Sequence, residues 1–182
     1  MQQQMHEGFS VPPLSKQVIV NAAQHARKVL ALPDGAINAG RLLDQLTVFG
    51  IYYDVMDRAV DFMPAGVEAC YLPEDRTIYI RDAVYGQMCK TGNRAQFTLG
   101  HELGHAVLAH RRTFNRQATS APIYCNSEWQ ANTFAAEFLM PLALVDKNRL
   151  TNAADIANYF GVSQAAARNR WESIMKEKSP KA

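Results

Sequence analysis

The sequence predicts an α+β fold in which a small three-stranded antiparallel sheet packs against a long helix. Two observations predict it. Apolar residues recur at helical spacing over most of the chain, whereas residues 51–81 contain three short runs rich in β-branched and aromatic side chains. The chain has 182 residues, 48% of them hydrophobic, which suits one well-buried core rather than two domains.

The N-terminal part predicts an extended lead-in and two helices. Residues 1–14 are rich in Gln and include a Pro-Pro pair, and such stretches resist regular structure. Helical spacing of apolar residues predicts a helix over 15–30. Asn38 can cap a second helix, and Gly50 suits the residue after its end.

Three strands are expected over residues 51–56, 67–72 and 77–81. Residues 73–76 join the last two at hairpin length, so these two strands should pair antiparallel. Residues 82–92 suit a loop or a short helix.

A long helix should then run from Asn93 or Arg94 to His110. The polar connection over 111–122 is long enough to form the rim of a cleft. Further helices are expected over residues 128–139 (capped by Ser127 and closed by Pro141), 143–150, 153–160 and from Ser163 onward.

The long helix carries His101-Glu102-Leu103-Gly104-His105. Histidines at i and i+4 stand one turn apart on one helix face, so both imidazoles can reach one metal ion. Glu102 lies beside them, where it can take a proton from a metal-activated water.

A third ligand has to come from another element, because catalytic zinc usually holds three protein ligands and leaves one position open. Glu128 opens the next predicted helix and meets this need. One turn later, Asn132 could hydrogen-bond the free ring nitrogen of a ligating histidine.

Two blocks together closely resemble the ImmA/IrrE family of metallo-endopeptidases. They are Phe97-Thr98-Leu99-Gly100-His101-Glu102-Leu103-Gly104-His105 and Glu128-x-x-Ala131-Asn132-x-Phe134-Ala135-Ala136-Glu137-Phe138-Leu139-Met140-Pro141. The resemblance covers roughly residues 42–150 and includes the histidine at 110. By analogy with thermolysin-like zincins, it favours Glu128 over Glu137 as the ligand. Gln130 departs from a second acidic residue that many relatives carry.

The resemblance implies a stand-alone zinc-dependent endopeptidase that cuts a regulatory protein, a helix-turn-helix repressor or antitoxin-like partner. His101, His105 and Glu128 would hold Zn²⁺, and Glu102 would serve as the catalytic base. Tyr124, Arg111 and Arg112 are candidates to stabilise the oxyanion, by proximity in sequence only.

Spacing also bears on two other positions. His110 follows His105 by five residues, which turns it away from the metal face of a continuous helix and favours packing or capping near the helix end. Cys125 is expected to be a free thiol, with an inhibitory metal ligand as the alternative.

The competing function is a zinc-binding sensor, or a DNA- or partner-binding regulator, with weak or no peptidase activity. Residues 155–164 resemble the first helix and turn of a helix-turn-helix, and Arg168 and Arg170 follow on the next helix. We favour a helical hairpin packed on the core, so nucleic acid is possible but not the preferred partner. The expected units are a lead-in (1–14), a peptidase domain (15–150) and a helical accessory (151–182).

The overall composition excludes several classes. The formal net charge of +2 neither demands nor excludes nucleic acid. Three widely spaced cysteines argue against a disulfide framework. No apolar run approaches the ~20 residues of a membrane span and the N-terminus is not a signal peptide, so we expect a cytoplasmic protein without a membrane partner. The sequence indicates no oligomeric state.

Overall fold

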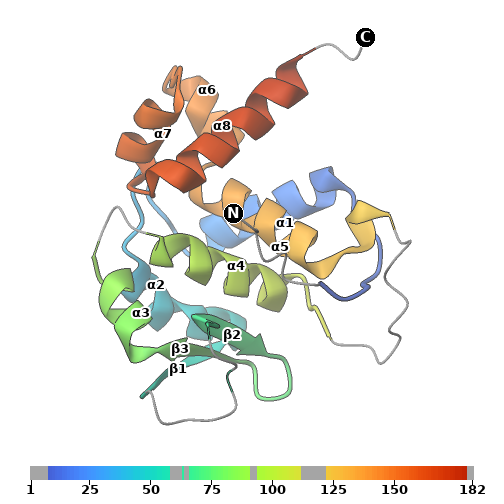
Figure 1. Cartoon of the computed structure of the whole chain (residues 1–182), viewed down its shortest axis with the longest axis vertical. Coiled ribbons are helices and arrows are strands. Elements are labelled where there is room, and N and C mark those ends of the chain that lie inside the picture. Colours follow the sequence, from blue (N-terminus) through green and yellow to red (C-terminus); the bar gives the residue numbers. More distant parts are fainter. Residues whose placement is uncertain (1–7, 58–62, 64–65, 91–93, 112–121, 180–182) are drawn as a thin grey trace.

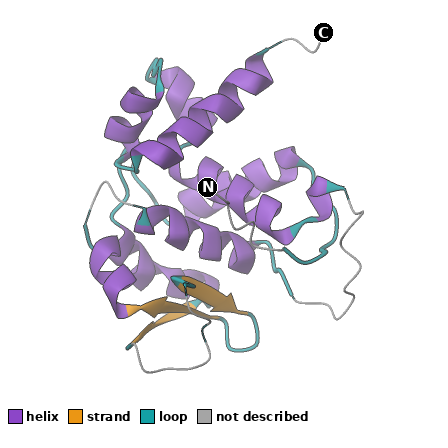
Figure 2. Cartoon of the chain, in the orientation of Figure 1, coloured by secondary structure: helices purple, strands orange, loops and turns teal. Residues whose placement is uncertain are grey.

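The computed structural model describes residues 8–57, 63, 66–90, 94–111 and 122–179. Its α+β class agrees with the prediction (Figure 2). The elements in chain order are α1 (Lys16–Val29), α2 (Ala39–Gln45), the 3₁₀ helix η1 (Leu46–Phe49), β1 (Tyr52–Met56), β2 (Ala69–Leu72), β3 (Thr77–Arg81), α3 (Asp82–Met88), α4 (Ala95–Val107), the 3₁₀ helix η2 (Ile123–Cys125), α5 (Ser127–Leu139), α6 (Leu142–Lys147), α7 (Ala153–Phe160) and α8 (Gln164–Lys178).

Helix α4 lies at the centre of the molecule (Figure 1). The sheet covers one side of it through β2, and α5 packs on the other side. Helix α1 packs against α5, and α6, α7 and α8 gather at the end of the molecule farthest from the sheet. Helix α5 is therefore enclosed between α4 and α1, with Phe134 and Phe138 fully buried.

The predicted cap of the second helix, Asn38, is confirmed, and Ser15 caps the first helix. The side chain of Ser15 accepts a hydrogen bond from the backbone N–H of Val18, and the side chain of Asn38 accepts one from Arg41. Gly50 ends the 3₁₀ turn after α2 with φ +65°, a left-handed conformation that favours glycine.

The prediction of a purely antiparallel sheet was wrong. The strand order is β1-β3-β2, and β1 pairs parallel with β3, whereas β2 pairs antiparallel with β3. The 73–76 turn fixes only the β2–β3 pair. The central position went to β3, whose Ile78 and Ile80 are fully buried, so β1 had to pair with the outer edge of that strand.

The cap of α5 also differs from the expectation. The side chain of Asn126 accepts a hydrogen bond from the backbone N–H of Trp129 and caps the helix, while Ser127 is its first residue. Ser127 is fully buried, and its hydroxyl accepts a hydrogen bond from the backbone N–H of Phe9 at 3.1 Å.

Residues 8–14, which we call the N-terminal strap, run alongside the start of α5. Ser10 forms an isolated antiparallel bridge with Asn126. The backbone N–H of Val11 donates to the carbonyl of Cys125 at 2.9 Å, and that of Leu14 donates to the carbonyl of Tyr124 at 3.3 Å. The strap and residues 124–127, which are more than 100 residues apart in the sequence, thus lie side by side.

The helices expected over 143–150, over 153–160 and after Ser163 are confirmed as α6, α7 and α8. Arg170 of α8 is buried, donates from Nε to the carbonyl of Met140 at 2.9 Å and forms an ion pair with Glu137 of α5. These contacts fix α8 against the end of α5. Most of the polar connection predicted as a cleft rim, residues 112–121, lies outside the described residues.

Candidate metal centre

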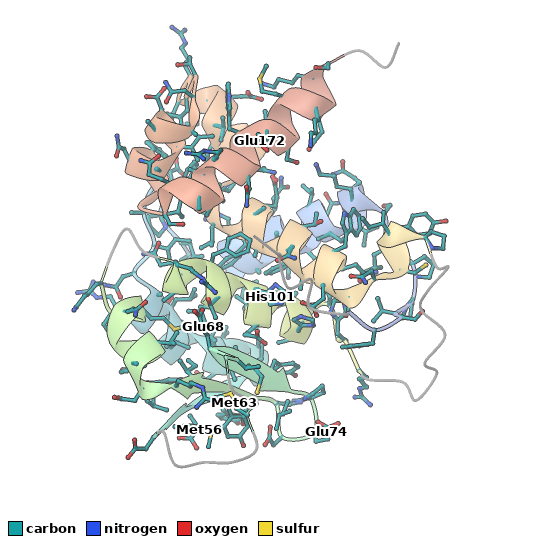
Figure 3. All side chains as sticks on the ribbon, in the orientation of Figure 1. Met56, Met63, Glu68, Glu74, His101 and Glu172 are labelled. Atoms are coloured by element: carbon teal, nitrogen blue, oxygen red, sulfur yellow. The ribbon has the colours of Figure 1, made fainter. Side chains whose placement is uncertain are left out.

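Helices α4 and α5 bring the three predicted ligands together. His101 and His105 lie one turn apart on α4, and Glu128 lies in the first turn of α5 (His101 is labelled in Figure 3). The Nε2 atoms of the two histidines are 3.1 Å apart. Glu128 places Oε2 3.2 Å from Nε2 of His101 and Oε1 3.3 Å from Nε2 of His105.

These spacings fit a tetrahedral metal ion. Ligand atoms bonded to zinc at roughly 2.0–2.1 Å occupy tetrahedron corners about 3.3–3.4 Å apart. The three side chains, each partly buried, could therefore hold one metal ion, and they form the cluster found among the described residues. Three protein ligands are the number that a catalytic zinc site uses when its fourth position is left to water.

The ring nitrogens that face away from the cluster also have partners. Nδ1 of His101 lies 2.9 Å from Oδ1 of Asn132, the contact predicted from the sequence. Nδ1 of His105 lies 3.0 Å from Nδ1 of His110. An imidazole whose Nδ1 carries the proton keeps the Nε2 lone pair free for a metal.

Glu102 projects beside the histidines and is 9% exposed. One carboxylate oxygen, Oε2, accepts a hydrogen bond from the backbone N–H of Tyr71 in β2 at 2.8 Å. Burial raises the pKa of Glu102, although the nearby histidines and the Tyr71 N–H oppose this shift. A carboxylate with a raised pKa is a better proton acceptor than a solvated one.

The pKa values of Glu128 and His110 are both lowered, but for different reasons. Burial raises the pKa of Glu128, yet the two imidazoles facing it outweigh burial and hold its pKa well below the usual range, so it is a carboxylate. Burial lowers the pKa of His110 to about 4, so its ring is neutral near pH 7.

Glu137, the carboxylate that the sequence left as a rival ligand, is not at the site. It is buried, forms the ion pair with Arg170 and accepts a hydrogen bond from the backbone N–H of Leu142 at 3.1 Å. It joins α5, α6 and α8 rather than binding a metal.

Other sequence candidates lie outside the cluster. None of the three cysteines is part of a disulfide among the described residues, and Cys125 is not one of the three clustered side chains. Tyr124 and Arg111 are exposed, and no described contact joins either side chain to the three ligands; Arg112 lies outside the described residues. Oxyanion stabilisation by any of them stays a prediction.

Two features of this centre were not predicted from the sequence. One is Gln130, which is fully buried and contacts His110 through Oε1 at 2.9 Å. The other is the N-terminal strap: Phe9 stacks on His105 with ring centroids 6.4 Å apart, and a Cβ at Gly8 would lie 2.8 Å from Cγ of Glu128. Only the departure of Gln130 from an acidic residue could have drawn attention to it.

Comparison with known proteins agrees with this geometry. A family model described as the IrrE N-terminal-like domain (Peptidase_M78) matches residues 74–172, which is more than half of the chain. The chain belongs to the Peptidase_M78 family. The part of this Peptidase_M78 chain that matches contains all of α4 and α5, and therefore the whole His101, His105 and Glu128 cluster.

A structural comparison gives the same fold. A Mycobacterium tuberculosis transcriptional regulator superposes with a TM-score of 0.54 at 18% sequence identity. The match covers 84% of this chain but only 46% of that regulator. No curated protein matches the sequence. Within the described residues, none of the helices combines the length and apolar character needed to cross a bilayer.

Proposed function

We propose that this Peptidase_M78 chain is a zinc-dependent endopeptidase. The observation that carries the proposal is the convergence of two imidazole nitrogens and one carboxylate at tetrahedral spacing, with a separate buried glutamate beside them. This donor set, two histidines and one carboxylate, is the one used by the thermolysin class of zinc peptidases. We propose zinc because this mixed set of nitrogen and oxygen donors at tetrahedral spacing suits it.

Glu102 is the proposed catalytic residue. A bound zinc ion would polarise the scissile carbonyl and lower the pKa of a water molecule toward 7. Glu102 would accept the proton of the attacking water and then deliver it to the leaving amine. The hydrogen bond from Tyr71 holds its carboxylate beside the histidines without occupying both oxygens.

The edge of β2 offers a place for an extended substrate. The backbone N–H of Arg81 donates to the carbonyl of Glu68, so alternate residues of β2 pair with β3 while Ala69 and Tyr71 turn their backbone groups to the outer edge. The Tyr71 N–H on this edge already binds Glu102. A peptide that pairs with this edge would pass beside the proposed catalytic residue.

The proposed substrate is a regulatory protein, a helix-turn-helix repressor or antitoxin-like partner. The resemblance seen in the sequence supports this class of substrate. Such a protein would bind through its extended backbone along the sheet edge, with little dependence on its side chains. A protein of this kind would have to expose a segment that can extend along β2.

The Glu102→Gln substitution tests the catalytic role. The variant should retain about one zinc per chain, because Glu102 is not among the clustered ligands, and should lose cleavage by ~10²-fold or more, as removal of a general base does. Zinc content is measured by elemental analysis, and cleavage with a library of peptides read by mass spectrometry. Absence of zinc in the wild-type protein, or full activity in the variant, would contradict the proposal.

A second candidate is a metal-binding regulator with weak peptidase activity. It is favoured by α7 and α8, which are joined by a short turn at Gly161 (φ +63°) as in a helix-turn-helix, and by the fold shared with a transcriptional regulator. Against it, Arg170 is buried and paired with Glu137, so of the two arginines at 168 and 170 only Arg168 is exposed. Sequence-selective DNA binding at physiological salt would establish this second function.

A further inference from the structure

A buried chain of hydrogen bonds runs from His105 to the N-terminal strap. Nδ1 of His105 lies 3.0 Å from Nδ1 of His110, and Nε2 of His110 lies 2.9 Å from Oε1 of Gln130. The amide nitrogen of Gln130 donates to the carbonyl of Pro12 at 2.9 Å and to the carbonyl of Tyr124 at 2.7 Å. His110 and Gln130 are 3% and 0% exposed, so water does not substitute for these partners.

The carbonyl groups of Pro12 and Tyr124, at the end of the hydrogen-bond chain, determine where each proton lies. Carbonyl oxygens only accept, so both N–H groups of the Gln130 amide point to Pro12 and Tyr124, and its oxygen faces His110. Nε2 of His110 must therefore carry a proton. A neutral imidazole has one N–H group, so Nδ1 of His110 accepts, and the proton between the two rings belongs to Nδ1 of His105.

This assignment of protons decides which nitrogen of His105 is available to a metal ion. With its proton on Nδ1, His105 presents a bare lone pair on Nε2, the atom that faces His101 and Glu128. The opposite tautomer would place a proton where the metal has to bind. A partner that accepts from the far nitrogen also makes the ligating nitrogen more basic and fixes the plane of the ring.

The turn after α4 brings His110 to this position. Ala109 adopts a left-handed conformation with φ +54°, and the backbone N–H of His110 donates to the carbonyl of His105 at 3.0 Å. The N–H of Ala109 donates to Ala106 at 3.2 Å, which completes a Schellman motif. The chain therefore folds back, and the ring of His110 lies behind that of His105 instead of continuing around the helix.

We propose that His110 and Gln130 are positioning residues that hold His105 in its Nδ1–H form and that the strap, through Pro12, completes this support. The inference rests on the metal site of the proposed function and assigns a role that the ligand set alone does not contain. It also gives the buried amide at position 130 a purpose that a carboxylate could not serve, because a carboxylate cannot donate to the two carbonyl groups.

Zinc affinity of the full chain tests the proposal, measured by competition with a chromophoric chelator. His110→Leu should weaken zinc binding by roughly 10–100-fold, the usual effect of losing an outer partner of a metal ligand. His110→Asn should recover most of the affinity because its amide oxygen can accept from Nδ1 of His105. His25→Leu, at an exposed histidine of α1, is the matched control and should leave affinity unchanged.

Nitrogen-15 NMR of the histidine rings in the metal-free wild-type protein gives a second measurement that needs no variant. It should find the protons on Nδ1 of His105 and on Nε2 of His110. Wild-type zinc affinity in folded His110→Leu, or a His105 ring without a proton on Nδ1, would overturn the positioning role. Failure of the wild-type protein to bind zinc would instead contradict the proposed function, and the ring protons would still report on the hydrogen-bond chain.

Discussion

At the scale of single residues, Glu128 and Glu137 stand on one helix and differ in their partners. Glu128 faces two imidazoles and is 22% exposed in its side chain, whereas Glu137 is 4% exposed and paired with a guanidinium. Both oxygens of Glu137 accept hydrogen bonds, one from the backbone N–H of Leu142 and the other from Arg170. Position along α5 therefore separates the proposed ligand from the structural residue.

Substitution by alanine should separate the two roles. Glu128→Ala should weaken zinc binding by more than ~100-fold, beyond the loss expected for an outer partner, with a small change in stability. Glu137→Ala should lower the free energy of unfolding by ~3–5 kcal/mol because it leaves Arg170 buried without its counter-charge. Chelator competition and urea denaturation measure the two effects.

A double substitution, Glu137→Met with Arg170→Met, serves as the control for the ion pair. Because both charges are removed together, the double variant should be more stable than Glu137→Ala. Zinc affinity that falls further in Glu137→Ala than in Glu128→Ala would show that the ligand was assigned to the wrong glutamate.

At the scale of elements, the site depends on the close approach of α4 and α5. A Cβ at Gly104 would lie 3.0 Å from the carbonyl oxygen of Ala131 and 3.1 Å from its Cα. Glycine at this position lets two backbones approach, and the same approach brings Glu128 within reach of both histidines. The glycine inside the motif thus has a packing role.

Gly104→Ala should therefore destabilise the protein by ~1–3 kcal/mol, since the neighbouring backbone has to move, and should weaken zinc binding with it. Gly86→Ala is the matched control: Gly86 is also helical, and nothing lies within 4 Å of its added Cβ. That control should gain up to ~1 kcal/mol from helix propensity. Equal stability of the two variants in thermal unfolding would refute the close-approach argument.

At the scale of the whole molecule, a bound metal would link α4 to α5. An ion that binds only the folded state stabilises it by about 2.7 kcal/mol when its free concentration is 100 times Kd. Zinc should accordingly raise the unfolding temperature of the wild-type protein and a chelator should reverse the change. The same titration of Glu128→Ala should show little shift; an equal shift there would mean that zinc binds elsewhere.

The strap is a second link across the molecule. It pairs with residues 124–127, places Phe9 against His105 and ends the hydrogen-bond chain at Pro12. The composition of residues 8–14 does not indicate the pairing with this segment, because the backbone groups that make those hydrogen bonds are the same in any sequence.

The sequence by itself determined the features that local spacing controls. The i, i+4 histidines lie on one helix face, the 73–76 turn pairs β2 with β3, and Glu128 comes at the start of the next helix. Each follows from helical or hairpin geometry over a few residues, so an isolated stretch of sequence contains enough information.

Only the tertiary structure decided the rest. The parallel pairing of β1 with β3 depends on which strand occupies the centre of the sheet, and β3, with Ile78 and Ile80 fully buried, occupies it. Extrapolation of a straight helix placed His110 away from the metal, but α4 ends at Val107 and the left-handed turn at Ala109 returns the ring to His105. Neither outcome is local, because the first depends on distant strands and the second on a backbone conformation that buried partners stabilise.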